Sequence, residues 1–219
     1  MSPDVLLEHA PLFARAAVVT VRIAALGILG ALAVGLVCAA VEHFRVPVGR
    51  QAVRAYVELA RNTPLVVQLF FLYFALPKVG VVWSGEACAI IGLTFLGGGY
   101  MAEALRSGLD TVDASQVDGA LSLGMSRGAA LRHVVLPQGV AVAVPALTAN
   151  VIFLVKETSV VSVVALPDLM YVAKDIIGSS YDTREALTLL VVAYLVILLP
   201  VALGARALEG RWRRAGLGS

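Results

Sequence analysis

The sequence has few of the residues from which metal sites, disulfides and charged binding surfaces are built. Among its 219 residues there are two cysteines, three histidines and only 15% Asp, Glu, Lys and Arg, and the formal net charge is +2. A balance this small gives no argument for a nucleic-acid partner. The histidines His9, His43 and His133 have no metal-ligand spacing, and Cys38 and Cys88 fall in apolar stretches where small packing residues are expected. We therefore expect no metal site and no cofactor.

Catalytic motifs are absent as well. No stretch has the form G-x-x-x-x-G-K-[S/T], which cradles the phosphates of ATP, and there is no H-E-x-x-H helix or Ser/His/Asp arrangement. The chain is therefore not expected to be an enzyme. Any step driven by ATP would need a separate subunit.

Charge is missing altogether from five long stretches, although 59% of the chain is apolar. These stretches are 23–41, 62–77, 87–102, 133–155 and 186–205. A helix needs about 20 apolar residues to cross the hydrocarbon core of a bilayer. The pattern predicts an all-α integral membrane protein with a single transmembrane domain over 1–219. The five expected transmembrane helices lie at about 16–41, 57–77, 85–105, 139–164 and 186–205.

The basic residues between these spans predict the orientation. Arginines gather at 45–54, at 106–132 and at 206–214. The positive-inside rule places those three regions in the cytoplasm, so that the N-terminus is outside and the C-terminus inside. An odd number of spans is required, in agreement with five.

The cytoplasmic loop 106–137 has the pattern of a short amphipathic helix. Asp113 followed by Gln116 has the form of a capping box, and Val117, Ala120 and Leu121 place one apolar stripe on the turns that follow. Gly124 is placed to end the helix. The pattern predicts a helix over about 114–123, which could lie on the lipid interface, cover the bundle or bind a partner.

The same loop resembles the EAA motif of bacterial binding-protein-dependent importers. The resemblance is carried by D-G-A-L-S-L-G-M-S at 118–126 and V-L-P-Q at 135–138, with Asp118 in place of Glu and Gly119 in place of the first Ala. In that family the loop forms a coupling helix that inserts into a groove on the nucleotide-binding subunit. The resemblance implies that the ATPase-coupling residues are Asp118, Gly119, Ala120, Leu121, Gly124, Met125, Leu136 and Pro137.

Three further motifs resemble the polar amino-acid branch of this superfamily. R-N-T-P-L-V-V-Q at 61–68 is similar to R-G-T-P-x-x-x-Q, Y-M-A-E-A-L-R-S-G at 100–108 to Y-x-A-E-x-x-R-x-G, and K-E-T-S at 156–159 to K-D-T-S. The resemblance implies a type I ABC importer permease that moves a polar amino acid or similar solute across the bacterial cytoplasmic membrane. Its implied partners are two copies of an ATPase, a second or homologous permease, an extracytoplasmic solute-binding protein and membrane lipid.

Polar residues inside the expected spans are candidates for the substrate path, because ionisable groups are costly in a membrane. They are Thr63, Gln68, Asn150, Lys156, Glu157, Thr158 and Ser159. The alternative is that Lys156 and Glu157 form a structural ion pair. Glu103 and Arg106, at i and i+3 near the inner end of the third span, are expected to form a salt bridge or an inner gate.

Two other functions remain open at this point. An ion-coupled secondary carrier would need no ATPase, but the inverted repeats that favour it are not visible in the sequence. A structural membrane subunit without an ATPase is the other alternative.

Overall fold

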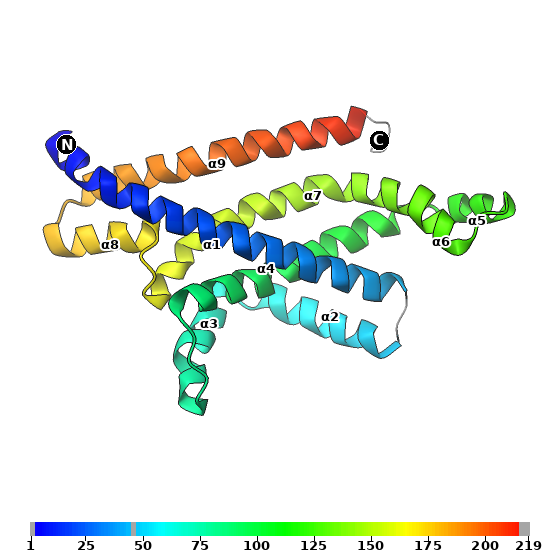
Figure 1. Ribbon diagram of the computed structural model, residues 1–219, viewed down its shortest axis with the longest axis horizontal. Coiled ribbons are helices and arrows are strands. Elements are labelled where there is room, and N and C mark those ends of the chain that lie inside the picture. Colours follow the sequence, from blue (N-terminus) through cyan, green and yellow to red (C-terminus); the bar gives the residue numbers. More distant parts are fainter. Residues whose placement is uncertain (1–2, 45–46, 215–219) are drawn as a thin grey trace.

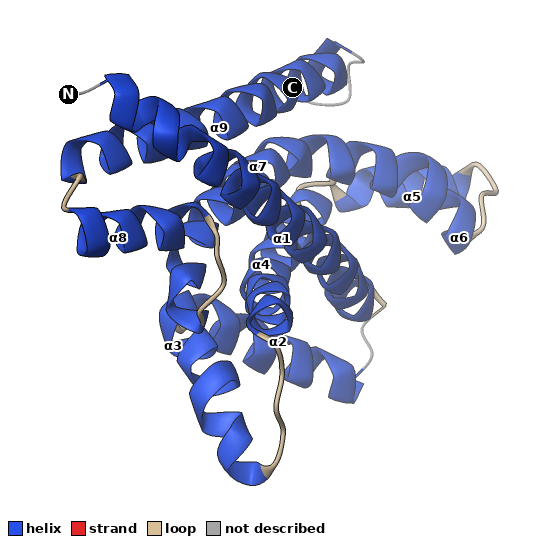
Figure 2. Cartoon of the chain, turned by 60° about the vertical axis from the view of Figure 1, so that its left-hand side comes forward, coloured by secondary structure: helices blue, strands red, loops and turns tan. Residues whose placement is uncertain are grey.

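The computed structural model describes residues 3–44 and 47–214, and these residues form helices and no strand (Figures 1 and 2). Arg45 and the tail beyond Arg214 lie outside the described residues. The α-helices are α1 (Pro3–His43), α2 (Pro47–Asn62), α3 (Leu65–Phe70), α4 (Gly85–Asp110), α5 (Ala114–Ser122), α6 (Arg127–Ala130), α7 (Leu136–Glu157), α8 (Leu169–Ser180) and α9 (Thr183–Arg214). Tighter or wider turns continue several of them: η1 (Phe71–Ala75), η2 (Leu76–Val79), η3 (Leu131–Val135) and η4 (Thr158–Val164).

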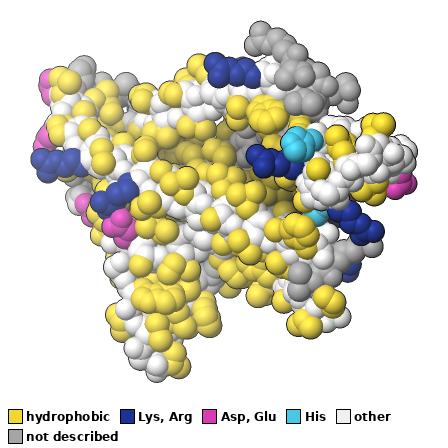
Figure 3. All heavy atoms as spheres, turned by 45° about the vertical axis from the view of Figure 1, so that its right-hand side comes forward, with side chains coloured by type: hydrophobic (Ala, Val, Ile, Leu, Met, Phe, Trp, Pro, Cys, Tyr) yellow, Lys and Arg dark blue, Asp and Glu magenta, His cyan; other side chains and the backbone are white. Residues whose placement is uncertain are grey.

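The all-helical membrane fold expected from the sequence is confirmed. Four helical stretches are long and apolar enough to cross a membrane, and the bent pair 47–62 and 65–79 would make a fifth if it is one span. Apolar side chains cover the middle of the body, while charged side chains gather towards its two ends (Figure 3). The N-terminal end of α1 lies with α8 at one end of the molecule, and α5 and the end of α9 lie at the other (Figure 1). We call these the α8 end and the α5 end.

The second expected span is not one continuous helix. Helix α2 begins at Pro47 and lies against α1 and α4, and the chain then bends by 103° before α3. Proline lacks a backbone N–H and blocks the preceding turn, which explains why the helix stops before Pro64. Residues 65–79, which we call the side arm, begin against α4 and η4, where Leu65 and Leu69 are buried, and extend away from the bundle from there (Figure 1).

Gln68 occupies the bend. Its amide nitrogen lies 3.0 Å from the carbonyl oxygen of Thr63 and 3.3 Å from that of Ala60, and donates to both. The broken helix therefore keeps these two carbonyls satisfied through a side chain of its own segment rather than through a neighbouring helix.

The main core forms where α1, α4 and α7 pack together. Ile23, Leu93, Met101 and Leu154 are each at most 1% exposed. A Cβ added at Gly97 of α4 would lie 2.6 Å from Leu154 Cδ1 and 2.7 Å from the Cβ of Ala31. Glycine thus allows three membrane helices to approach one another closely at this point.

Helix α8 is an element that the sequence reasoning missed, because the segment between the fourth and fifth expected spans was interpreted as a loop. Leu169, Ala173 and Ile176 are buried against α1 and α9 at helical spacing. Asp168 caps the helix: its Oδ1 accepts a hydrogen bond of 2.9 Å from the N–H of Tyr171. Thr20 of α1 accepts a second, of 3.2 Å, from the N–H of Leu169. The cap residue and the spacing were both available in the sequence as signals.

The buried carboxyl of Asp168 makes the stability of the folded protein depend on pH. It is fully buried, Oδ2 has no hydrogen-bond partner among the described residues, and burial raises its pKa from 3.8 to about 6. The protonated form is favoured in the folded protein, so the contribution to stability is complete below about pH 4 and lost as the pH rises through about 6. The rise of this pKa from 3.8 to about 6 corresponds to about 3 kcal/mol in the free energy of unfolding.

Replacing Asp168 with asparagine should raise the apparent melting temperature at about pH 7.5 and change it little at about pH 4.5. Asparagine caps a helix about as well as aspartate and brings no charge into the core. Thermal unfolding of the detergent-solubilised protein at both pH values measures this. Asp168→Ala, which loses the cap, should lower the melting temperature at both. A lower melting temperature for Asp168→Asn at pH 7.5 would show that the ionised carboxylate stabilises the fold.

Candidate functional site

The helix expected in the loop is present as α5, with defined caps at both ends. Asp113 Oδ1 accepts a hydrogen bond of 2.8 Å from the N–H of Ser115, and this bond lowers the pKa of Asp113. At the other end Gly124 has φ +84°, its N–H donates to Leu121 O at 3.0 Å, and the N–H of Met125 donates to Ala120 O at 3.1 Å. This pair of bonds is a Schellman motif, which ends a helix sharply.

One detail of the expected cap differs. Gln116 does not complete a capping box with Asp113, because its side-chain oxygen accepts a 2.6 Å hydrogen bond from Nε2 of Gln138. Gln138 lies in the first turn of α7, against which the loop folds back. A tertiary bond has replaced the local one, and it ties α5 to the start of α7.

Helix α5 projects beyond the bundle at the α5 end (Figure 1). The residues implied by the EAA resemblance divide there into two groups. Ala120 is buried, and Leu121 and Pro137 are partly buried, so these three hold the helix onto the protein. Facing solvent are Asp118, Gly119, Gly124, Met125 and Leu136. Leu123, which the sequence reasoning did not single out, is 85% exposed and forms an apolar tip.

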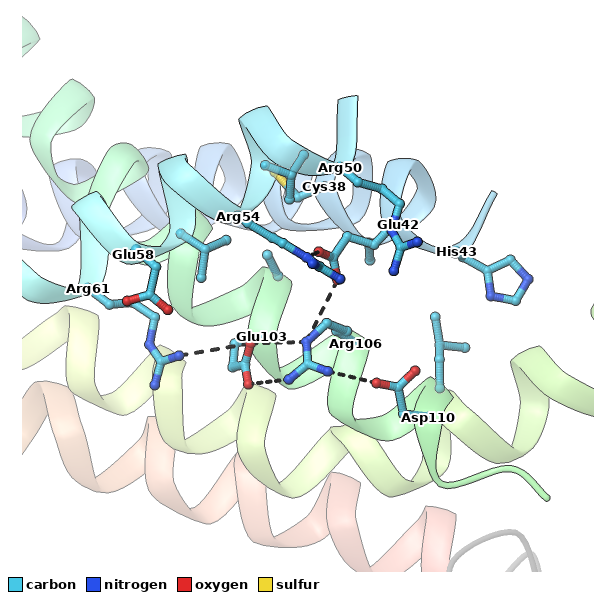
Figure 4. Close-up of a pocket in the computed structure, with 15 residues that line it drawn as sticks. Cys38, Glu42, His43, Arg50, Arg54, Glu58, Arg61, Glu103, Arg106 and Asp110 are labelled. Atoms are coloured by element: carbon cyan, nitrogen blue, oxygen red, sulfur yellow. Dashed lines mark hydrogen bonds and ion pairs between the residues drawn. The ribbon is translucent and has the colours of Figure 1, made fainter. Parts of the chain in front are cut away.

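A second feature is a charged cavity of about 740 Å³ between α1, α2 and α4 (Figure 4). Eight of the residues that line it are charged: Arg50, Arg54, Arg61 and Arg106 oppose Glu42, Glu58, Glu103 and Asp110. The cavity thus carries equal numbers of cationic and anionic side chains.

Arg106 is the centre of an ion-pair network in this cavity. Its nitrogens lie 2.6 Å from Glu103, 2.7 Å from Asp110 and 3.8 Å from Glu42, and Arg54 lies 3.4 Å from Glu42. The expected Glu103–Arg106 salt bridge is therefore present. Glu42, which extends the network to α1 and α2, was not anticipated from the sequence.

The seven predicted substrate-path residues do not line this cavity. The Gln68 amide is bonded at the bend, Asn150 donates a 3.1 Å hydrogen bond to Tyr100 O, and the buried Thr158 lies 2.7 Å from Val155 O and 3.3 Å from the Tyr194 hydroxyl. Their polar groups thus make contacts inside the bundle.

Lys156 and Glu157, at the end of α7, differ from the other predicted path residues. Lys156 is exposed and Glu157 partly buried. Adjacent helix positions point in different directions, which does not favour an ion pair between the two.

Comparison with known proteins identifies the family. Residues 16–214 match the model of the binding-protein-dependent transport system inner membrane component. The chain belongs to this family. The permease is therefore a multi-pass inner-membrane protein, and its family is one of transport components rather than enzymes.

Individual relatives extend over nearly the whole permease. It is 34% identical to the probable glutamine ABC transporter permease protein GlnP of Bacillus subtilis (strain 168), over 93% of this chain and 95% of that protein. It is also 34% identical to the probable amino-acid ABC transporter permease protein PatM of Vibrio harveyi, over 92% and 93%. A solved structure described as an amino acid ABC transporter with histidines superimposes with a TM-score of 0.89 at 28% identity, over 96% of this chain and 99% of that one.

Proposed function

We propose that the permease forms the translocation path of an ABC importer for a polar amino acid or an amino-acid-like solute. Two copies of a separate ATPase would drive it, and an extracytoplasmic binding protein would supply the solute. A second copy of this chain, or a homologous permease, would complete the path. The substrate class rests on the names of the relatives, and the ATPase partner rests on one observation, the shape of α5.

Helix α5 has the properties that a docking element needs. It is capped at both ends, it is tied to α7 through Gln116, and it carries an exposed apolar tip at Leu123 beside the exposed carboxylate of Asp118. An exposed apolar patch rimmed by polar residues is typical of a protein interface, and the exposed Met125 follows Leu123 two positions later. A helix that only covered the bundle would bury its larger apolar residues.

The orientation with N-terminus outside and C-terminus inside is part of the proposal. The described basic regions at 50–54, 106–132 and 206–214 share the α5 end, and the N-terminal end of α1 lies at the opposite end (Figure 1). Both observations agree with the positive-inside rule. The α5 end would then face the cytoplasm, where ATP is available.

The seven predicted path residues remain part of the proposal, and we assign them two kinds of role, contact with the solute and support of the backbone. Lys156 and Glu157 are the two ionisable members of the predicted set, and neither side chain makes a hydrogen bond within the described residues, so they are the members best placed to meet a solute. Gln68 and Thr158 act through the backbone bonds that shape the bend and the end of α7. Thr63, Asn150 and Ser159 would complete the polar lining.

Reversing the charge of Asp118 tests the ATPase dock. If α5 binds an ABC ATPase, Asp118→Lys should reduce the amount of ATPase that co-purifies with the tagged permease by about five-fold or more. Reversing a charge in a docking surface places it opposite groups of the same sign, which weakens the complex. Asp175→Lys, an exposed charge reversal on α8 at the opposite end, is the matched control and should retain the ATPase.

The outcomes separate the three functions. Normal ATPase retention by Asp118→Lys would contradict the dock. Uptake of labelled amino acids into vesicles that persists without ATP and collapses with the proton gradient would identify a secondary carrier. Absence of any uptake or ATPase association in the unaltered protein would favour a structural subunit.

A further inference from the structure

Two arginines of the charged cavity, Arg50 and Arg61, make no side-chain hydrogen bond to the network, and the buried Nε of Arg50 has no hydrogen-bond partner among the described residues. Arg106 is engaged by three carboxylates and Arg54 by Glu42, whereas Arg61 reaches only Glu103, at 3.9 Å. That separation is too long for a hydrogen bond. Arg61 makes no hydrogen bond within the described residues, so its fork of N–H donors faces the cavity unused.

Neighbouring groups hold the Arg61 side chain in place. Its guanidinium carbon lies 5.4 Å from the centre of the Tyr100 ring, within the range of a cation–π contact. Asn150 of α7 in turn donates to the carbonyl of Tyr100. The guanidinium is thus positioned by stacking, which leaves its edge available for a planar partner.

A carboxylate lies beside this guanidinium. Glu58 is one turn earlier on α2, and Figure 4 shows Glu58 and Arg61 together at the end of the cavity away from His43 and Asp110. The side chain of Glu58 accepts a 2.9 Å hydrogen bond from Asn62, and no arginine lies within salt-bridge distance of it in the described chain. Arg61, whose one ion pair is long, and Glu58, which has no arginine partner among the described residues, therefore stand next to each other.

The balance of charge indicates the class of ligand. A cavity with four arginines and four carboxylates attracts neither a net anion nor a net cation strongly. A zwitterion suits it, because a carboxylate can form a bidentate pair with guanidinium while an ammonium group meets a carboxylate or an aromatic face.

We propose that Arg61 binds the α-carboxylate of the transported amino acid, and that Glu58 receives its ammonium group, in a cavity that opens at the α5 end. The proposal rests on the proposed function, since it places the release side of the same path. The bound carboxylate would take the place of Glu103 beside Arg61, and thereby remove the 3.9 Å contact that joins α2 to α4.

Binding to the purified permease–ATPase complex, without the binding protein, tests the site. Import into proteoliposomes, with ATP and the solute-binding protein added for this step alone, first identifies which amino acid of an equimolar labelled mixture the unaltered complex transports. Its affinity for the detergent-solubilised complex is then measured beside two analogues, the α-carboxamide without the carboxylate and the N-acetyl derivative without the ammonium group.

Each variant is expected to lose affinity for the amino acid but not for the analogue that lacks the group it binds. Arg61→Gln should weaken binding of the amino acid about ten-fold or more, yet leave the weak binding of the carboxamide unchanged. Glu58→Gln should weaken binding of the amino acid and leave binding of the N-acetyl derivative unchanged. Arg61→Lys, which keeps the charge but loses the fork, should be intermediate. Arg22→Gln is the control, because Arg22 forms a 2.7 Å ion pair with Glu86 far from the cavity.

Other outcomes overturn the proposal. Arg61 does not bind the carboxylate if the affinity of Arg61→Gln for the amino acid is within two-fold of that of the unaltered complex. The same conclusion follows if the substitution lowers the affinities for the amino acid and for its carboxamide equally. Failure of the unaltered complex to import any amino acid is a different result, because it contradicts the proposed function itself. Elution of each variant as a single complex with the ATPase shows that it is folded.

Discussion

Replacing Gly97 with leucine is expected to prevent the bundle from assembling. The site lies where α1, α4 and α7 meet, and even a single added carbon would come within 2.6 Å of Leu154 and 2.7 Å of Ala31. Both neighbours are fully buried, so neither can move aside without disturbing the core. Overpacking of this kind costs about 3 kcal/mol or more. We expect little monodisperse protein after extraction, as measured by size-exclusion chromatography of a fluorescently tagged permease.

The matched control is the same substitution at Gly204. This glycine lies within α9 and has no atom within 4 Å of an added Cβ. Gly204→Leu should therefore be extracted at close to the unaltered yield, since leucine is also the better helix former. A normal elution profile for Gly97→Leu would mean that the three helices can separate at this level without loss of the fold.

Replacing Gly124 with valine should reduce coupled transport about ten-fold while the bundle remains folded. The space around Gly124 is open, so the effect comes from its backbone, whose φ of +84° is strained for any L residue and most for a β-branched one. Relief of the strain would undo the bonds from Gly124 and Met125 that end α5. If α5 docks on an ATPase as proposed, the exposed tip at Leu123 would then no longer fit its groove. ATP-dependent uptake into proteoliposomes measures the loss.

Two variants separate backbone strain from other causes. Gly124→Asn should transport nearly normally, because asparagine tolerates the left-handed conformation. Gly119→Ala should also transport normally, because there is open space at this position and alanine is the usual residue there in the EAA motif that the loop resembles; it strengthens the helix by about 1 kcal/mol. Equal activity of Gly124→Val and Gly124→Asn would show that the end of α5 has no part in coupling.

The features that the sequence predicted well depend on residues close together in the chain. Asp113, the apolar stripe and Gly124 specify α5 within twelve residues, and the structure ends the helix within one residue of the expected position. The uncharged stretches predicted the membrane helices for the same reason, since each stretch is a local run. The fork between Glu103 and Arg106 spans a single helical turn.

What the sequence did not predict depends on contacts between distant segments. Proline is tolerated in some membrane helices and breaks others. Here α2 packs on α4, and the chain bends by 103° at Pro64 before the side arm begins. Glu42 joins Arg106 across 64 positions of sequence, so no local pattern could place it in the cavity. Arg61 and Glu103 each lie in a motif that marks the family, yet only the fold brings them together.

The side arm has a consequence for the way the permease meets its lipid surroundings. Phe70, Phe71 and Phe74 are about half exposed on it. Acyl chains solvate such rings about as well as an apolar protein surface does, because in a bilayer no hydrophobic free energy separates the two environments. Lipids and protein can therefore exchange on this surface with only packing differences to overcome. The 103° bend thus leaves a flank on which neighbours can be replaced during a conformational cycle without exposing apolar groups to water.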